Sequence, residues 1–314
     1  MCNVSCRVGG SRERWHAGVV SSPQSAYVPE LTDGVVRLRG ATPADLPRIV
    51  EQANDPEAVR WTTVPHPYAA SDAEAFLAVM HEGWLAETGT RTWVIATEEL
   101  PYAGLVDLRY RGPGVAAVGY VLHPAARGEG LMARALRTAA RYAFAVGPWG
   151  RPLESITWEA VVGNFASRRV AWACGFTHHG TVTGAVGGRR PDGTEGAMDL
   201  WVGSLGAADV MQPVAPWLEV PRLVGERVVL REWRESDRSA AQPMQTLGHF
   251  MPDGATPSQL TFDAWLLSRR ERAAAGAAVQ WCIADKETDE AYGSVLVFSH
   301  GHPIDPPGAE LGYF

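Results

Sequence analysis

A short glycine-containing turn between two strongly patterned segments constrains the fold of this chain more than any other feature. The apolar run at 116–122 has the length and composition of a buried strand, and residues 131–145 repeat apolar side chains at helical spacing. The turn between them contains Arg127, Gly128 and Gly130. A strand, a glycine turn and a helix in this order direct free backbone N–H groups at one point, beside the positive end of the helix. The pattern therefore predicts an anion site suited to a phosphate.

Three kinds of phosphate ligand bind turns of this type. A P-loop nucleotide site needs Lys and a hydroxyl residue after its last glycine, but Leu131 follows here, so this ligand is excluded. Segment 128–133 fits the dinucleotide fingerprint, with Glu154 at a spacing suited to a ribose contact. However, four residues separate the strand end at Leu122 from Arg127, whereas the dinucleotide turn follows its strand directly. The third ligand is the pyrophosphate of coenzyme A, and the next segment favours it.

A second motif follows the helix. Residues 155–162 have the pattern of another strand, and Asn164 and Ser167 begin a short helix that ends at Gly175. In this order the two motifs resemble the GNAT acetyltransferase superfamily, and the Asn164/Ser167 version resembles its RimJ/RimL-type branch, which acetylates protein N-termini and small amines. The resemblance covers residues 31–205. It implies an α/β fold with a mixed central sheet that splays open and is flanked by helices.

The resemblance implies acetyl-CoA as the cosubstrate and no metal. The thioester arm would lie in the gap where two parallel strands splay apart, and the pantetheine amides would pair with the exposed strand edge. The pyrophosphate would bind backbone amides of the glycine turn, and Asn164 would contact the pantetheine arm while it caps its helix. The residues implied for cofactor binding are Tyr120, Val121, Leu122, Arg127, Gly128, Glu129, Gly130, Leu131, Met132 and Asn164.

Acetyl transfer to an amine needs a base for the amine, a donor for the oxyanion and an acid for the departing thiolate. Many relatives place Tyr three residues before a Gly-Phe pair, which here is Gly175-Phe176. In this chain the position holds Trp172, whose side chain has no titrating proton. We therefore expect Ser167 to be the general acid; the alternative is a hydrogen bond back into its own helix. The acceptor is expected beside the least patterned segments, 61–66 and 184–196.

The sequence leaves the general base open. Many relatives carry Glu two residues before a Gly-Tyr pair, which here is Gly119-Tyr120 in the strand at 116–122. This chain has Ala117 at the position of that Glu. Glu159, Asp199 and His123 remain as candidates, and Glu159 is the one we predict. Because Ala117 replaces that Glu, the sequence is compatible with two functions. One is an N-acetyltransferase that acts on a small amine or a protein N-terminus by direct attack in a ternary complex. The other is a non-catalytic acyl-CoA-binding or scaffolding protein.

The net charge and the cysteines limit which partners and which cellular compartment the sequence favours. The net charge is −7 and no block of basic residues exists, so a nucleic-acid or anionic-membrane partner is not indicated. No apolar run approaches the roughly 20 residues of a membrane span. Cys2, Cys6, Cys174 and Cys282 are scattered without metal-ligand spacing. They favour free thiols in the reducing cytoplasm.

Part of the first segment recurs later in the chain. Residues 31–39, followed by Asp45, match residues 223–231, followed by Asp237, and each is predicted to form a short strand before a helix. Three further short segments recur in the same order, which predicts two homologous domains in tandem. We expect a disordered leader at 1–28, an acetyltransferase domain at 29–205, a linker at 206–221 and the N-terminal half of a second GNAT-like domain at 222–314.

The second copy has no counterpart of the glycine turn before Phe314. An unpaired strand edge and half a core would leave such a unit marginal. Two interpretations follow: the chain is a fragment of a longer tandem protein, or the half-domain is stabilised by packing on the first domain within the same chain.

Overall fold

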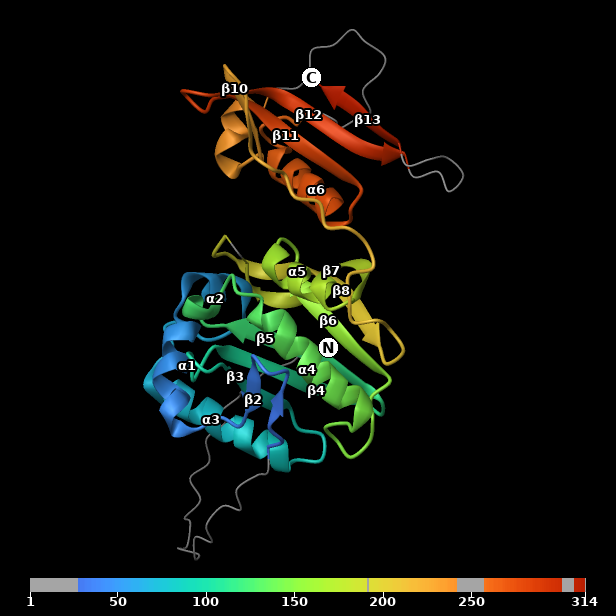
Figure 1. The fold of residues 1–314 in the computed structure, drawn as a ribbon. Coiled ribbons are helices and arrows are strands. Elements are labelled where there is room, and N and C mark those ends of the chain that lie inside the picture. The colour runs from blue at the N-terminus through green and yellow to red at the C-terminus, as the bar shows by residue number, and fades with distance from the viewer. Residues whose placement is uncertain (1–27, 191, 242–256, 301–307, 314) are drawn as a thin grey trace, which may run out of the picture. The chain divides into compact units, whose positions relative to one another are not determined.

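The computed structural model describes residues 28–190, 192–241, 257–300 and 308–313. The expected leader, apart from its last residue, lies outside the described residues. The chain divides into two compact units, Met1–Pro213 and Val214–Phe314 (Figure 1).

An eight-stranded mixed sheet forms the centre of the first unit, in the order β1-β2-β3-β4-β5-β6-β8-β7. Its strands are β1 Leu31–Thr32, β2 Arg37–Arg39, β3 Arg91–Ala96, β4 Gly104–Gly112, β5 Val115–Leu122, β6 Ser155–Val161, β7 Thr177–Arg189 and β8 Glu195–Gly206. The expectation of one strand over 31–39 is wrong. The Asp33 carboxylate accepts the N–H groups of Val35 and Val36, both at 2.9 Å, and closes a turn that separates β1 from β2.

Helices cover both faces of this sheet (Figure 1). They are η1 Pro43–Asp45, α1 Leu46–Ala53, α2 Pro56–Trp61, α3 Ala70–Leu85, η2 Pro124–Ala126, α4 Leu131–Ala145 and α5 Phe165–Ala173. On one face, Ile49 of α1 and Leu77 of α3 pack in a cluster with Val94 of β3 and Leu105 of β4. On the other face, α4 contacts β1, β2, β4 and β5 through its apolar side. We name these the α1–α3 face and the α4 face.

The centre of the sheet opens between β5 and β6, the one parallel pair among the described strands of this sheet. Pairing runs from Val115 opposite Ser155 to Val118 opposite Trp158 and then stops. Beyond that point β5 pairs only with β4, and β6 pairs only with β8. The predicted splay is confirmed. We call the place where the two strands part the fork.

The second unit contains a five-stranded antiparallel sheet in the order β13-β12-β11-β10-β9. Its elements are β9 Leu223–Val224, β10 Val228–Arg231, η3 Glu235–Ala240, α6 Phe262–Ala274, β11 Ala278–Asp285, β12 Ala291–His300 and β13 Gly308–Tyr313. On one face Phe262 and Trp265 of α6 pack with Trp233 and Cys282. The strands follow one another along the sheet in chain order, as β1 to β5 do in the first unit.

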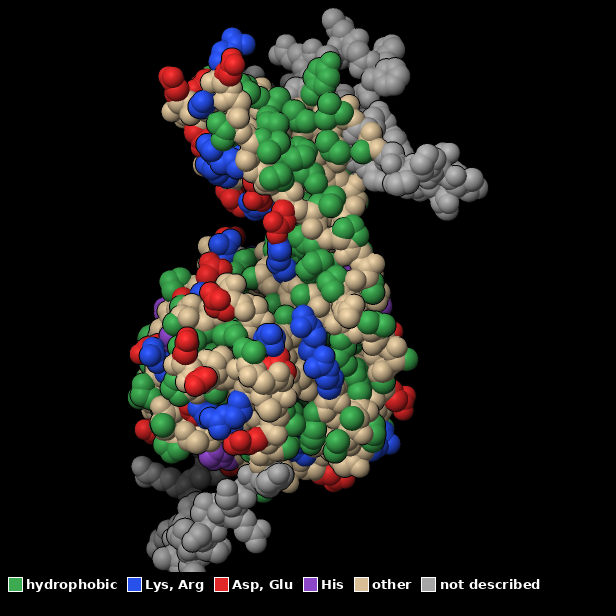
Figure 2. Space-filling view, viewed as in Figure 1, with side chains coloured by type: hydrophobic (Ala, Val, Ile, Leu, Met, Phe, Trp, Pro, Cys, Tyr) green, Lys and Arg blue, Asp and Glu red, His purple; other side chains and the backbone are tan. Residues whose placement is uncertain are grey.

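The opposite face of this second sheet is apolar and open to solvent. By strand alternation it carries Leu223, Leu311 and Tyr313, which are 48%, 62% and 78% exposed. Figure 2 shows hydrophobic side chains gathered over this unit. In the first unit the corresponding face is the α4 face, where Leu38 and Trp93 are fully buried. None of the helices in the described part of the chain is long and apolar enough to cross a membrane.

Candidate active site

The glycine turn leads from β5 into α4 as predicted. Gly128 and Gly130 have φ values of 88° and 69°, a left-handed conformation that glycine adopts without strain. A Cβ built on either glycine would meet nothing within 4 Å, so the surface of the turn is open. Gly130 caps α4 without a side-chain hydrogen bond, and the first amides of a helix, here Leu131 and Met132, have no intrahelical partner. The turn therefore presents several backbone donors to an anion.

The arginines nearest the turn are paired with aspartates. Arg127 contacts Asp55 at the start of α2, and Arg134 of α4 contacts Asp33 at 2.6 Å. Burial opposes ionisation of Asp55, but its bonds with Arg127 and with the N–H of Ala58 hold the pKa of this carboxyl below its usual value. The backbone amides of the turn are thus its unpaired donors, and Arg127 adds positive charge beside them.

Strand alternation decides which backbone groups of β5 reach the fork. The N–H of His123, just after β5, donates to the carbonyl of Ala103 beside β4 at 2.9 Å. Because successive residues direct their backbone groups to opposite sides, Val121 faces β4, while Tyr120 and Leu122 face the fork. The free strand edge is therefore formed by Tyr120 and Leu122.

Ser167 lies at the fork in a network that joins three elements. Its Oγ accepts a hydrogen bond from Nε1 of Trp158 on β6 at 3.0 Å and donates one to Oη of Tyr120 on β5 at 3.0 Å. Tyr120 Oη donates to the carbonyl of Ser167 at 2.9 Å, and burial raises the pKa of Tyr120. The Ser167 hydroxyl therefore does not bond back into its own helix. Asn164 accepts the N–H of Ser167 at 3.0 Å and caps α5 as predicted.

The two segments expected beside the acceptor lie close together. A Cβ built on Gly188 of β7 would lie 3.7 Å from Cγ2 of Thr63, which follows α2. Nearby, on the α1–α3 face, a cavity of about 120 Å³ is lined mainly by apolar side chains, among them Phe76, Leu105 and Val121. It adjoins the α1–α3 side of β5 at the free strand edge.

Comparison with known proteins agrees with this arrangement. Residues 36–177 match the family model described as an acetyltransferase (GNAT) domain. The first unit has a GNAT-like fold. No curated protein matches the chain in sequence.

Several solved structures are similar to the GNAT-like unit. A GNAT-family acetyltransferase from Bacillus anthracis is 15% identical, with a TM-score of 0.48 over 57% of this chain and 99% of that one. Spermidine N-acetyltransferase from Vibrio cholerae, in complex with CoA and spermine, is 16% identical, with a TM-score of 0.47 over 56% and 98%. Mycobacterium smegmatis RimJ, in complex with CoA-disulfide, is 18% identical, with a TM-score of 0.49 over 58% and 90%.

The three base candidates differ in their surroundings. His123 is buried, with Nε2 3.1 Å from Oε2 of Glu51, and its Nδ1 accepts the N–H of Ala125 at 3.2 Å. Asp199 accepts the N–H of Gly184 at 2.8 Å. Glu159 lies just beyond the fork on β6, with its side chain 41% exposed and 3.8 Å from Arg111. His123 and Asp199 therefore hold local structure together, and the role of Glu159 stays a prediction.

Two side chains at the fork were not singled out from the sequence. Trp158 orients Ser167 through its indole N–H. Asp107 of β4 lies beside Gly119, next to the point where β5 leaves β6. A signal for Asp107 existed, because it is a charged residue within the apolar run Leu105-Val106-Asp107-Leu108. Among the described residues, no group of three or more His, Cys, Asp or Glu could hold a metal ion.

Proposed function

We propose that the GNAT-like unit transfers the acetyl group of acetyl-CoA to a primary amine by direct attack in a ternary complex. The acceptor is a small molecule or a protein N-terminus. The observation that carries the proposal is the position of the Ser167 hydroxyl at the fork, beside a free strand edge that leads into an open anion turn. An acyl carrier with a thioester at one end and a pyrophosphate at the other matches these features in order.

Each part of acetyl-CoA has a partner in this proposal. Backbone amides of Gly128, Glu129, Gly130, Leu131 and Met132 bind the pyrophosphate, with Arg127 alongside. The edge formed by Tyr120, Val121 and Leu122 pairs with the pantetheine amides, through the backbone groups of Tyr120 and Leu122. The Asn164 side-chain oxygen is engaged with Ser167 N–H, so its NH₂ group contacts the pantetheine arm.

Ser167 supplies the proton for the departing thiolate. Its Oγ is held in place by the Trp158 N–H, and its hydroxyl hydrogen can rotate from Tyr120 to the sulfur. Tyr120 is then in position to return a proton to the serine oxygen. A thiolate is a good leaving group, so this step assists the reaction and is not indispensable to it.

The second candidate function is a non-catalytic acyl-CoA-binding or scaffolding protein. The observation that favours it is Ala117, which stands where many relatives carry a catalytic Glu. A thiol-release assay separates the two functions. The assay supplies acetyl-CoA with polyamines and with short peptides that have a free N-terminus. An enzyme releases coenzyme A only when an amine is present, whereas a binder releases none.

Coenzyme binding is tested separately through Gly128→Val, with Gly150→Val as its matched control. Both glycines have positive φ, 88° and 80°, and open space at the Cβ position, so the two substitutions carry similar backbone strain. A side chain at residue 128 blocks the approach to the pyrophosphate. Each amide-to-anion hydrogen bond lost costs about 1.5–3 kcal/mol, which is roughly tenfold or more in Kd. Isothermal titration with coenzyme A should show this loss for Gly128→Val alone.

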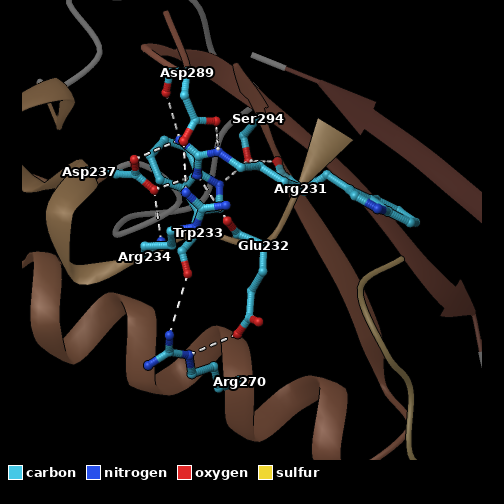
Figure 3. Close-up of polar contacts among 9 residues, drawn as sticks. Arg231, Glu232, Trp233, Arg234, Asp237, Arg270, Asp289 and Ser294 are labelled. Carbon is cyan, nitrogen blue, oxygen red and sulfur yellow. Dashed lines mark hydrogen bonds and ion pairs between the residues drawn. The ribbon is translucent and has the colours of Figure 1, made fainter. Parts of the chain in front are cut away.

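We further propose that the second unit is a second GNAT-like copy. Arg231 donates to both oxygens of Asp237, at 2.8 and 2.9 Å (Figure 3). Arg39 does the same to Asp45, at 2.8 and 2.7 Å. A tryptophan on the next strand repeats as well: Trp281 Nε1 donates to the carbonyl of Pro221, and Trp93 Nε1 to that of Pro29. The same contacts recur at the same places in β1 to β5 and in β9 to β13, two runs of five strands that share one order, and they support a common origin.

We place the activity in the cytoplasm. Cys174 and Cys282 are buried free thiols, and burial raises the pKa of each to about 12. Free buried thiols suit a reducing compartment.

A further inference from the structure

The two sides of β5 at the fork are occupied differently. On the α4 face, Tyr120 and Trp158 converge on Ser167 and fill the space beside the thiolate's proton donor. Residues that alternate with Tyr120, namely Gly119 and Val121, point to the α1–α3 face. That face carries the cavity described above. An amine therefore reaches the thioester carbon from the α1–α3 face, and its base must lie there.

Asp107 is a carboxylate on this face, directly beside the fork. It pairs with Gly119 across the β4–β5 ladder, and residues directly opposite each other project to the same side. A Cβ built on Gly119 would lie closest to Nη2 of Arg109, and 2.6 Å from Oδ2 and 2.9 Å from Oδ1 of Asp107. The Asp107 carboxylate and the Arg109 guanidinium that holds it thus share the space that a side chain at residue 119 would take. Val118, one residue earlier, is the last residue of β5 paired with β6.

The same carboxylate is next to the cavity and to the position of the missing Glu. Leu105 and Val121, each two residues from the Asp107–Gly119 pair along its strand, line the cavity. Ala117, two residues before Gly119, pairs with Arg109. Same-face residues two apart on adjacent strands lie about 7–8 Å from one another, so Asp107 is a close neighbour of the position of the missing Glu.

The surroundings of Asp107 suit a proton acceptor. Burial raises its pKa, although the Arg109 guanidinium and the N–H of Gly119 act in the opposite direction. Arg109 Nε donates to Oδ1 at 2.9 Å and fixes the orientation of the carboxylate. The side chain is 26% exposed, so an amine can reach it. Other charged or titratable groups on this face include Arg111 and Glu159, which lie 3.8 Å from each other, and His123, whose Nε2 lies 3.1 Å from Oε2 of Glu51.

We propose that Asp107, on β4, is the general base of the acetyl transfer. It has the role that many relatives give to a Glu on β5, at the position where this chain has Ala117. This inference rests on the proposed function. A carboxylate that is oriented, partly desolvated and beside the acceptor cavity meets the geometric requirement for a base. Glu159, the base expected from the sequence, is more exposed and faces Arg111.

The reaction is balanced with these two groups. The acceptor ammonium gives a proton to the Asp107 carboxylate, and its nitrogen lone pair forms the C–N bond with the thioester carbon. The C–S bond breaks, and the thiolate takes the hydroxyl proton of Ser167, on the other face of β5. The nitrogen loses its second proton to solvent as the amide forms, and the Ser167 oxygen takes up a proton from solvent through Tyr120. The amide and free coenzyme A leave, and Asp107 returns its proton to solvent through its exposed part.

The test compares Asp107→Asn with Asp263→Asn, which changes an arginine-paired aspartate of the second unit. Acetyl-CoA serves as donor, and spermidine and a short peptide with a free N-terminus serve as acceptors. At neutral pH Asp107→Asn should lower kcat by about 10²–10⁴-fold, with an unchanged Kd for acetyl-CoA. The loss should shrink as the pH rises toward the pKa of the amine, because the solution then deprotonates the acceptor. Asp263→Asn should behave as the unsubstituted chain does.

Three results would overturn the assignment. Thiol release by Asp107→Asn at the full rate excludes the base role. A loss that is constant across pH, with a lowered melting temperature or weakened acetyl-CoA binding, makes Asp107 a structural residue. A loss confined to Glu159→Gln in the same assay assigns the base to β6. Absence of amine-dependent release by the unsubstituted chain is a different failure, since it rejects the proposed function and the base together.

Discussion

At the scale of single residues, the orientation of the Ser167 hydroxyl at the fork depends on its hydrogen-bond partners. A serine in a helix ordinarily bonds back to its own backbone. Here an indole N–H from β6 and a phenol from β5 engage the hydroxyl, so it faces the gap in which the thioester would lie. Replacing Ser167 by Ala removes the proposed proton donor and leaves the amides of the glycine turn untouched.

We expect Ser167→Ala to lower kcat by about 10²–10⁴-fold while acetyl-CoA affinity is nearly kept. The variant also loses the acceptor of the Trp158 N–H. Ser294→Ala is its matched control, because Ser294 is a fully buried serine of the second unit whose Oγ accepts from Trp233 Nε1 at 3.3 Å. The control should lose stability without losing turnover. If Ser167→Ala instead abolishes coenzyme binding, the serine is a pantetheine contact, and if turnover is unchanged, the acid is another group.

At the scale of elements, a buried ion pair joins β2 to η1. The side chains of Arg39 and Asp45 are 13% and 4% exposed, and Asp45 also accepts the N–H of Thr42 at 2.8 Å. Burial opposes ionisation of Asp45, but Arg39 and Thr42 outweigh it and lower its pKa. A carboxyl whose pKa is lowered by folding stabilises the fold above its unfolded pKa and loses that contribution as the pH falls through its folded pKa.

Asp45→Asn should therefore reduce the unfolding free energy at pH 7 by about 3–5 kcal/mol, because Arg39 is left without its charge partner. The difference from the unsubstituted chain should be constant above about pH 5 and shrink below about pH 4. Urea unfolding of both proteins at several pH values measures it. Asp192→Asn, at an exposed hairpin position, is the control and should change little. An unfolding free-energy difference that does not vary with pH would contradict the ion-pair explanation.

Elements with a strong local pattern could be predicted from the sequence, and contacts between elements could not. Helix α4 spans Leu131–Ala145 as predicted, because its apolar spacing and the preceding glycines fix both its face and its start. The turn that splits residues 31–39 depends on hydrogen bonds from the backbone to the Asp33 side chain. The spacing of apolar residues in the sequence does not predict such bonds. Asp107 was missed for a related reason: its closeness to Gly119 follows from the β4–β5 register.

At the scale of the whole molecule, β1 to β5 and β9 to β13 follow the same strand order, but the glycine turn belongs to the first unit. The run Arg127-Gly128-Glu129-Gly130 occurs once in the sequence. We therefore expect equilibrium dialysis with coenzyme A to give one site per chain, and Gly128→Val to weaken that site. Two sites of similar affinity, or none, would contradict the placement of the coenzyme in the GNAT-like unit.

The uncovered apolar face of the second sheet has a consequence for hydrogen exchange. Strands β3 to β5 lie between two helical layers, whereas β11 to β13 have a helix on one side and exposed side chains such as Tyr313 on the other. Local opening costs less where fewer apolar contacts must be broken. In deuterium exchange followed by mass spectrometry, amides of β11 to β13 should exchange faster than those of β3 to β5. Equal protection of the two sheets would mean that in solution another surface shields the second one.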